Sequence, residues 1–505
     1  MLPFALLALA PLTSASSSCD THPPKPPPLN FHIDLAPTLS TSALVVTPDN
    51  PQFSYYTHQN LKSKSPQYSV VVVVATEADV SAAVTFANKH DIPFTAKVSG
   101  HGTWAGLGDI KGGMNIWLRN LSSVVVAEDR GHVVVGGGAM VDEVVGRLWE
   151  GGKQTATALG QCIGITGSGI GGGLGPLMGV YGLGLDQFVG FRVVLANGTV
   201  VSADVETNPD LFWALRGAGH NFGIITEVKL RIYDRKGSSD WSYRQLSFSG
   251  DKVEAVFDEI NNKRRASPPP PLSEILYQLI DVLQAIIDLR LFSNAFSPSQ
   301  LEAYAASFLA LSPLKNTTTL ALDYPGLIAE MGYATAPEGC TPPAGSFGSV
   351  FGAAVERHVP AAMRKMYNLF NEVIKTIPEL WASYIFVEGY GTEAMRQVPE
   401  RSTAWAHRVP HGMCWTDGSG INVVLAYKAD QMNATLEGIV QKRGEEIRAA
   451  KLEGQDRQRS YVNYAVKQES LESMYGYEAW RLEKLRGLKK ELDPKNRFGF
   501  FAPIF

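Results

Sequence analysis

Excess basic charge is missing from this chain of 505 residues, which has 45 lysines and arginines against 49 acidic residues and a formal net charge of -4. No block of Lys and Arg stands out, so binding to a nucleic-acid backbone has no support. Long apolar runs are also missing, and none approaches the roughly 18 residues of a membrane span. The content of 45% hydrophobic and 19% charged residues is typical of a globular protein and excludes disorder over most of the chain.

Cysteine is scarce, and the four residues are Cys19, Cys162, Cys340 and Cys414. They form no Cys-x-x-Cys pair and no cluster with histidine, so a structural zinc site or other metal site is not expected. Cys340 and Cys414 are candidates for a disulfide. The motifs of P-loop enzymes, serine hydrolases with a Gly-x-Ser-x-Gly elbow and His-Glu-x-x-His metalloenzymes are absent as well.

The N-terminus begins with an apolar, uncharged run that ends at Leu12, and small residues follow at Ser14, Ala15 and Ser16. We interpret residues 1–18 as a secretory signal peptide, which places the protein in the secretory pathway or outside the cell. Asn-x-Ser/Thr sequons would then be candidates for glycosylation. They begin at Asn120, Asn197, Asn316 and Asn433.

The first half of the chain predicts an α/β unit followed by antiparallel strands. A β-branched run at 68–75 predicts a buried strand, and Thr76 with Asp79 forms a capping box that opens a helix over 80–90. A strand over 92–98 completes a strand–helix–strand unit. The further elements expected here are strands at 124–127 and 133–136, a helix at 141–150, a hairpin through Asn197-Gly198 and a strand at 224–232.

After Asp234 glycine becomes rarer and the pattern changes. The Pro-rich segment 267–271 predicts a loop or hinge. Helical periodicity at 299–311, 360–376 and 430–450, with strands at 380–387 and 421–427, predicts an α+β second domain. A helix at 477–488 precedes an apolar C-terminus, which we expect to be tied down against a core.

The segment Gly167-Ser-Gly169-Ile-Gly-Gly172 matches the G-x-G-x-x-G pattern of Rossmann folds. The Rossmann motif opens a long helix, whereas Pro176 and Gly179 follow shortly here and would interrupt one. A Rossmann site is therefore not expected.

Glycine is nevertheless concentrated between Gly100 and Gly223, in clusters at 99–102, 136–138 and 164–175. Backbone amides in glycine turns can approach a diphosphate closely because no Cβ stands in the way. Any one cluster can equally be a tight turn or a close strand crossing. Together, and with His101 in the first of them, they favour a bound dinucleotide.

Several motifs resemble one family in their order along the chain. They are the segment from Ile92 to His101, Gly171-Gly-Gly-Leu-Gly175, Tyr181-Gly-Leu183, Asp186, Asn197-Gly198, Asp210–Gly217, Asn221–Thr226, Tyr461-Val-Asn-Tyr464, Tyr475-Gly476 and Asp493-Pro494. This set resembles the vanillyl-alcohol-oxidase/p-cresol-methylhydroxylase superfamily of flavoenzymes. It is most similar to the fungal berberine-bridge-enzyme-like FAD-linked oxidoreductases.

The resemblance implies an α+β, two-domain PCMH-type FAD-binding fold, whose second, α+β substrate domain has an antiparallel sheet covered by helices. The implied boundaries are 19–59 for an N-terminal leader, 60–234 for the FAD-binding domain, 235–455 for the substrate domain and 456–505 for a C-terminal segment that returns to the FAD domain.

The resemblance also implies FAD bonded covalently to His101 at the 8α-methyl group of the flavin ring. The flanking Gly100 and Gly102 leave room for that ring. Relatives with a second, cysteinyl link carry a cysteine where Gly160 stands here, so that second link is not expected, and Cys162 is expected to be a buried thiol. The other implied cofactor-binding residues are Ser99, Gly164, Gly167, Gly171, Gly172, Gly173, Ile225 and Asn463.

The oxidation of an alcohol or amine requires a base near the flavin. Tyr461 and Tyr464 resemble the family's tyrosine motif, in which one tyrosine acts as base or merely packs on the cofactor, and the sequence does not decide between them. The segment from Thr403 to His407 is expected to be a strand whose alternation puts Trp405 and His407 on one face. That makes His407 a third catalytic candidate, and Glu388 and Tyr390 are weaker ones.

The function implied is an FAD-dependent oxidoreductase that takes a hydride from a small organic molecule, with molecular oxygen as the electron acceptor. A tailoring oxidase of natural-product biosynthesis is favoured, because the sugar oxidases of the family typically have both flavin links. The alternatives are a secreted carbohydrate or oligosaccharide oxidase and a flavin-binding secreted protein without turnover. The sequence does not indicate an oligomeric state.

Overall fold

The computed structural model describes residues 29–59, 65–235, 241–264, 273–281, 284–331, 346–355, 357–380, 383–408, 420–428, 433–455 and 457–505. The predicted signal peptide, the Pro-rich segment 267–271 and the candidate disulfide of Cys340 with Cys414 lie outside the described residues, as do the first part of the predicted leader and the ends of a few predicted elements. Within the described ranges, no helix has the length and apolarity needed to cross a membrane.

The first sheet is built from the predicted strand–helix–strand unit. Its strand order is β1 (Leu44–Val46), β2 (Tyr68–Val73), β4 (Gly113–Trp117) and β3 (Phe94–Lys97). Strand β4 lies between β2 and β3 and runs parallel to both, while β1 is antiparallel to β2. Parallel strands of one sheet require a crossover, and α3 (Glu77–Lys89) supplies the one from β2 to β3, which lie on either side of β4.

The capping box of α3 is confirmed. The Thr76 hydroxyl accepts a hydrogen bond from the Asp79 backbone at 3.2 Å, and the Asp79 carboxylate accepts one from the Thr76 backbone at 2.8 Å. Because the cap is Thr76 itself, the helix begins at Glu77, three residues earlier than predicted.

The second sheet has five antiparallel strands, and α4 (Val141–Glu150) has the predicted bounds. The strand order is β5 (Val124–Val126), β6 (His132–Gly136), β10 (Ile224–Arg231), β8 (Phe188–Val194) and β9 (Val200–Ala203). The predicted Asn-Gly hairpin joins β8 to β9, and Gly198 there has φ +87°, a conformation that glycine adopts without strain.

The largest sheet belongs to the second half of the chain and is antiparallel throughout. Its order is β15 (Lys315–Asn316), β12 (Trp241–Phe248), β14 (Gln284–Ser293), β13 (Ser273–Asp281), β18 (Tyr384–Gly389), β19 (Gly420–Lys428) and β17 (Ser346–Ala354), with β16 (Leu320–Leu322) also paired to β12. The antiparallel sheet implied for the second domain is therefore present.

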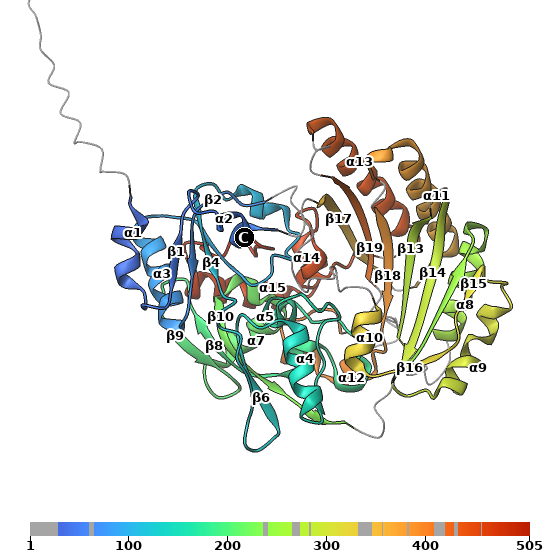
Figure 1. The fold of residues 1–505 in the computed structure, drawn as a ribbon, viewed down its shortest axis with the longest axis horizontal. Helices are drawn as coiled ribbons and strands as arrows, with labels where there is room; N and C mark the ends of the chain where they lie inside the picture. The colour runs from blue at the N-terminus through green and yellow to red at the C-terminus, as the bar shows by residue number, and fades with distance from the viewer. Residues whose placement is uncertain are drawn as a thin grey trace, which may run out of the picture.

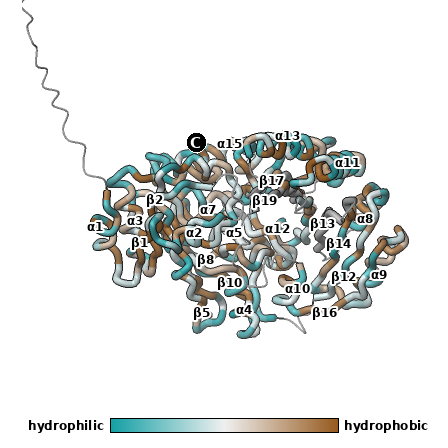
Figure 2. The backbone as a smooth tube through the Cα atoms, turned by 45° about the horizontal axis from the view of Figure 1, so that its top comes forward, coloured by the Kyte–Doolittle hydropathy of each residue, from teal (hydrophilic) through white to brown (hydrophobic). Residues whose placement is uncertain are grey.

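Helices cover one face of this sheet (Figure 1). They are α8 (Val253–Arg264), α9 (Pro298–Leu309), α11 (Pro360–Thr376) and α13 (Ala434–Lys451). In Figure 2, α11 shows hydrophilic and hydrophobic stretches in alternation, as expected of a helix with one buried side. On α11 the buried Met363, Met366 and Phe370 pack into the core that the helices share with the sheet.

Strand β18 shows how the two faces of the large sheet differ. Ile385 and Val387 pack into the core beneath the helices. Since side chains alternate along a strand, Tyr384, Phe386 and Glu388 face the other way, toward the first half of the chain. The prediction of a strand over 380–387 was placed too early, because Pro378–Leu380 form a 3-10 turn before β18 begins.

The strand predicted for residues 403–407 was wrong. Those residues have no regular secondary structure. Their backbone amides form hydrogen bonds with α7 (Pro209–Ala218), a helix that was not predicted. The amide of Trp405 donates to the carbonyl of Arg216 at 3.1 Å. At the kink of α7, Gly217 has φ +130°, and a Cβ there would lie 2.3 Å from the Trp405 nitrogen. The segment is therefore shaped by this close approach and not by strand pairing.

The C-terminal segment packs beside the second sheet. Its helix α15 (Ala479–Leu492) holds the fully buried pair of Lys489 and Asp493, whose charged groups lie 2.7 Å apart. The Lys489 ammonium also donates to the carbonyl of Asn221 at 2.9 Å. The Asn221 side chain in turn donates to the carbonyl of Ala502, which confirms that the apolar end is tied down.

Candidate active site

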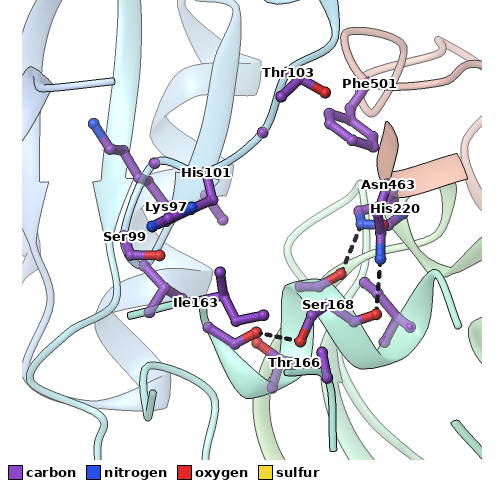
Figure 3. Close-up of a pocket in the computed structure, with 18 of the residues that line it drawn as sticks. Lys97, Ser99, His101, Thr103, Ile163, Thr166, Ser168, His220, Asn463 and Phe501 are labelled. Carbon is purple, nitrogen blue, oxygen red and sulfur yellow. Dashed lines mark hydrogen bonds between the residues drawn. The ribbon is translucent and has the colours of Figure 1, made fainter. Parts of the chain in front are cut away.

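A cavity of about 440 Å³ lies between the first two sheets and the open face of the large sheet. It is lined by the segment after β3, the glycine turn at 158–168, residues 220–225, strand β18 and two C-terminal segments at 461–464 and 498–501. Figure 3 shows the residues of the glycine turn and of the segment after β3 around this space.

Most of the residues singled out from the sequence line this cavity. They are Ser99, Gly100, His101, Gly102, Gly160, Gly164, Gly167, Ile225, Tyr461, Asn463 and Tyr464. The cavity lining does not include the candidates Gly171, Gly172, Gly173 and His407, the weaker candidate Tyr390 or the cluster at 136–138.

The turn at 171–173 supports the cavity from behind. A Cβ on Gly171 would lie 2.1 Å from the Asn463 amide oxygen, and one on Gly172 would lie 2.7 Å from the Tyr461 ring. The Gly173 amide donates to the Tyr461 hydroxyl at 3.1 Å. These glycines therefore give Tyr461 and Asn463 the space they occupy. At Gly137 a Cβ would lie 2.0 Å from the Ile225 carbonyl, so the cluster at 136–138 is a close strand crossing.

His101 stands in the segment after β3, where Gly100 has the positive φ of +81° that turns the chain toward the cavity. Burial, together with the smaller effect of the neighbouring His58, lowers the pKa of His101 to about 4. The imidazole is therefore neutral at physiological pH. A Cβ on the next residue, Gly102, would lie 3.2 Å from the Phe501 ring. The C-terminal segment therefore packs directly against the turn that carries His101.

Cys162 also lines the cavity, but the expectation of a free buried thiol was wrong. The residue is disulfide-bonded, and the three other cysteines of the sequence lie outside the described residues. A sulfur held in a disulfide has no thiolate with which to attack another group.

Tyr461 is fully buried and held by two donors. Its hydroxyl accepts hydrogen bonds from the Gly173 amide and, at 2.7 Å, from the side chain of Asn463. Burial raises the pKa of Tyr461 to about 12, against the lowering effect of these hydrogen bonds. A phenol in this state does not release its proton near neutral pH.

Glu388, a weaker candidate from the sequence, places a carboxyl group on the sheet side of the cavity. Burial raises the pKa of its carboxyl group to about 7, while hydrogen bonds from Tyr390 and Tyr464 lower it. The Tyr464 ring meets the Tyr461 ring edge-on, at 4.8 Å between centroids. The signal that could have found Glu388 was the alternation of β18, which puts it on the same face as Tyr384 and Phe386.

His407 lies outside the cavity. Its Nε2 atom is 3.2 Å from the carbonyl oxygen of Ser460, and its ring meets the Trp405 ring edge-on at 5.0 Å. Burial lowers its pKa to about 4. The structure thus packs His407 against the backbone that precedes Tyr461, without bringing it to the cavity.

Four polar groups that line the cavity have a buried atom without a hydrogen-bond partner among the described residues. The atoms are the Gln59 amide oxygen, the Lys97 ammonium nitrogen, Nδ1 of His220 and the carboxyl oxygen of Glu388 that Tyr390 does not contact. Burial lowers the pKa of Lys97 to about 7. Buried polar groups without partners indicate a site that is completed by a polar ligand. No cluster of possible metal ligands occurs in the part of the chain that the structure describes.

Comparisons with known proteins indicate what that ligand is. A family model described as "FAD binding domain" matches residues 68–204. The FAD-linked oxidoreductase chyH of Penicillium rubens is 34% identical to this chain over 479 residues, which cover 93% of each protein. The carbohydrate oxidase from Microdochium nivale shares the fold, with a TM-score of 0.79 and 20% identity over 94% of this chain and 99% of that one.

A second solved structure with the same fold is glucooligosaccharide oxidase from Acremonium strictum, which carries a 6-S-cysteinyl, 8α-N1-histidyl FAD. Its TM-score is 0.77 and its identity 19%, over 92% of this chain and 97% of that one. At such identities these structures show the shared fold.

The cavity fits FAD. Glycine positions at Gly100 and Gly167 leave backbone exposed to the space, and no atom lies within 4 Å of where a Cβ of Gly167 would stand. Lys97 offers a cation for the diphosphate, and Gln59 and His220 offer acceptors for its hydroxyl or amine groups. Aliphatic side chains such as Ile163 and Leu174 line the rest, as a flat aromatic ring requires.

Proposed function

This chain belongs to the berberine-bridge-enzyme-like FAD-linked oxidoreductases, and we propose that it oxidises a small, largely apolar alcohol or amine with a flavin bonded to His101. One observation carries the proposal. The neutral imidazole of His101 and the carboxyl group of Glu388 line the same cavity. One residue can hold the flavin while the other can receive the proton of the substrate.

The covalent bond is supported by the state of His101. His101 would hold the flavin at its 8α carbon: as the C–N bond formed, the methyl group and the imidazole would each give up a proton, and the flavin ring itself would take up the electron pair. This requires an imidazole lone pair, and the lowered pKa of about 4 leaves that lone pair available. The disulfide at Cys162 leaves no thiolate for a second link, so a single histidyl bond is expected here, in contrast to the two links of the glucooligosaccharide oxidase.

Proton removal falls to Glu388 and Tyr464. As a carboxylate, Glu388 can accept the proton of a substrate hydroxyl or amine, either directly or through the Tyr464 hydroxyl that hydrogen-bonds to it. A pKa of about 7 suits a base that works near neutral pH. When bound, FAD supplies the acceptor for the hydride that leaves the substrate carbon. The products are then a carbonyl compound or an imine and one proton on the protein.

Tyr461 has a different part in this proposal. Its hydroxyl is held by Gly173 and Asn463, and its pKa is raised to about 12. Tyr461 therefore orients the segment 461–464, which carries Tyr464. His407 supports the same segment through its contact with the carbonyl of Ser460, the residue before Tyr461. Both are positioning residues.

The wall opposite the glycine turns favours an apolar substrate. Its described residues are Val350, Tyr384, Phe386 and Tyr464, with Glu388 as the charged member. The rings of Phe386 and Tyr464 meet edge-on at 6.1 Å between centroids. Aromatic walls with few polar groups suit a flat or apolar molecule, which agrees with a tailoring oxidase of natural-product biosynthesis.

The experiment that tests this function is anaerobic reduction of the bound flavin by a substrate panel. Aromatic and allylic alcohols and amines are expected to bleach the flavin absorbance, and cello-oligosaccharides are not. Bleaching by oligosaccharides alone would establish the carbohydrate oxidase instead. A flavin that no member bleaches, although dithionite reduces it, would favour the binding protein without turnover.

Secretion and the use of oxygen complete the proposal. All four sequon asparagines, Asn120, Asn197, Asn316 and Asn433, are exposed, which agrees with glycosylation in the secretory pathway. Treatment of secreted protein with an endoglycosidase should then lower its mass. With oxygen as acceptor, each turnover in air should yield one hydrogen peroxide per substrate oxidised.

A further inference from the structure

His220 lines the cavity between the glycine turn and the C-terminal segment (Figure 3). Its Nε2 atom lies 3.0 Å from the carbonyl oxygen of Gly167. Its ring packs on that of Phe501, with the centroids 4.6 Å apart and the planes at 35°. The carbonyl and the phenyl ring together hold the imidazole in one orientation.

The contact with Gly167 fixes the tautomer. A carbonyl oxygen can only accept, so Nε2 must carry the hydrogen. Burial lowers the pKa of His220 to about 4, and the ring is therefore neutral near pH 7. In that state Nδ1 has a lone pair and no hydrogen, and it can only accept.

This acceptor is buried, and none of the residues that the structure describes donates to it. An acceptor removed from water without a partner costs free energy, so a ligand group that donates is expected beside it. The diphosphate oxygens of FAD cannot serve, because they are acceptors themselves. Its O–H and N–H groups can, and FAD carries them on the flavin ring, the ribityl chain, the ribose and the adenine.

We propose that Nδ1 of His220 accepts a hydrogen bond from an O–H or N–H group of FAD, which makes His220 a cofactor-binding residue of this chain. The proposal depends on FAD binding and not on the proposed oxidation. A failure of the substrate panel therefore leaves it standing, and its own failure leaves the substrate chemistry standing.

The test uses the full chain with His101→Ala, in which FAD binds reversibly, and measures its Kd by quenching of flavin fluorescence. His220→Gln is then added. The glutamine amide can still donate to the Gly167 carbonyl from near the Nε2 position, but it has no acceptor at the Nδ1 position. We expect Kd for FAD to rise about three- to tenfold, the loss of one hydrogen bond, while the melting temperature without FAD stays unchanged.

His220→Asn supplies the rescue, because its amide oxygen can occupy the region of Nδ1. It should recover part of the affinity that His220→Gln loses. The matched control is His358→Gln, since the His358 ring is also buried and also packs on a phenylalanine ring, that of Phe257 at 4.9 Å between centroids, but lies outside the cavity. It should leave Kd for FAD within about twofold.

Repeating the titrations with FMN and riboflavin identifies the part of FAD that carries the donor. An equal penalty with all three flavins assigns the donor to the flavin ring and ribityl chain, and a penalty with FAD alone assigns it to the adenosine. The proposal is overturned if His220→Gln leaves Kd for FAD unchanged. It is equally overturned if the variant lowers the melting temperature of the flavin-free protein as much as that of the loaded protein, because the role of His220 is then structural.

Discussion

Tyr390 donates a hydrogen bond of 2.7 Å from its hydroxyl group to the carboxyl group of Glu388, two positions earlier in the chain. Tyr390 is buried and does not line the cavity, whereas Glu388 does. The bond holds one carboxyl oxygen from the protein side and leaves the carboxyl group directed to the cavity, beside Tyr464. A base that is oriented in this way does not need to be ordered when the substrate arrives.

The first prediction concerns the pH dependence of catalysis. Because the pKa of Glu388 is raised to about 7, the fraction of carboxylate increases as pH rises through that value. The rate of anaerobic flavin reduction should therefore rise about tenfold per pH unit below 7 and level off above it. Stopped-flow measurements from pH 5 to 9 check this. Glu388→Gln should be slow and should lose this limb of the profile; a variant that keeps the limb would point to another base.

The same raised pKa predicts an effect on stability. The ordinary pKa of glutamate is 4.5, and in the folded protein it is about 7, so the folded state binds the proton more tightly. The stability that this tighter binding of the proton contributes is fully present below pH 4.5 and is lost as pH rises to about 7. Above pH 7, Glu388→Gln should be more stable than the parent by up to about 3 kcal/mol. Urea unfolding at pH 5 and pH 8 checks this, and a gap that does not grow with pH contradicts it.

The tyrosine pair gives a prediction with its own control. Tyr464→Phe removes the hydroxyl next to Glu388 and should slow flavin reduction by more than about a hundredfold, with the flavin spectrum unchanged. Tyr461→Phe removes a hydroxyl that accepts hydrogen bonds from Gly173 and Asn463, and it should slow flavin reduction only a few-fold. The reverse order of effects would identify Tyr461 as the base. Small effects in both would leave Glu388 to act alone.

Covalent attachment is checked by mass. Protein precipitated with acid should keep its yellow flavin, and the peptide that contains His101 should carry the mass of FAD. His101→Ala should release flavin into the supernatant while the fold persists. Peptides that contain Cys162 should carry no flavin, because that sulfur is in a disulfide. Flavin on a Cys162 peptide would mean that the disulfide is not present in the protein as it matures.

Much of the first half of the fold was predictable because its signals are local. The Thr76 cap, the bounds of α4 and the Asn-Gly hairpin each depend on a few neighbouring residues. The segment at 403–407 was not predictable in this way. It is held by the carbonyl groups of α7, about two hundred residues earlier in the chain, and periodicity within one segment carries no information on such a partner.

The residues of the candidate site also differ in whether the sequence could predict them. His101 and Tyr464 were found because they belong to motifs that resemble a family. Glu388 was ranked low because a carboxylate after a strand has no meaning until its neighbours are known, and its raised pKa arises from burial by residues remote in sequence. For His220 the informative feature is the missing partner of Nδ1, which only a structure can show.

The last prediction concerns the buried ion pair between Asp186 and Arg408, which ties the turn after Gly182 to the segment behind the cavity. Arg408 donates to Asp186 through both terminal nitrogens, one of them at 3.0 Å, and both side chains are buried. Asp186 also accepts from the Leu183 amide at 2.9 Å. Nothing in this arrangement touches the cavity, so its effect should be on stability and not on the flavin.

Asp186→Asn leaves the Arg408 charge buried without its counter-ion and should lower the free energy of unfolding by about 3–5 kcal/mol. Replacing both partners, as Asp186→Leu with Arg408→Met, removes the charge as well as the pair and should recover much of that loss. The matched control is the exposed pair of Asp109 and Lys467, 2.5 Å apart, where Asp109→Asn should have no measurable effect because water screens exposed charges. Urea unfolding of the three variants measures the differences. If the double variant is as unstable as Asp186→Asn, the loss comes from the Leu183 contact and from packing, and the unpaired charge is not its cause.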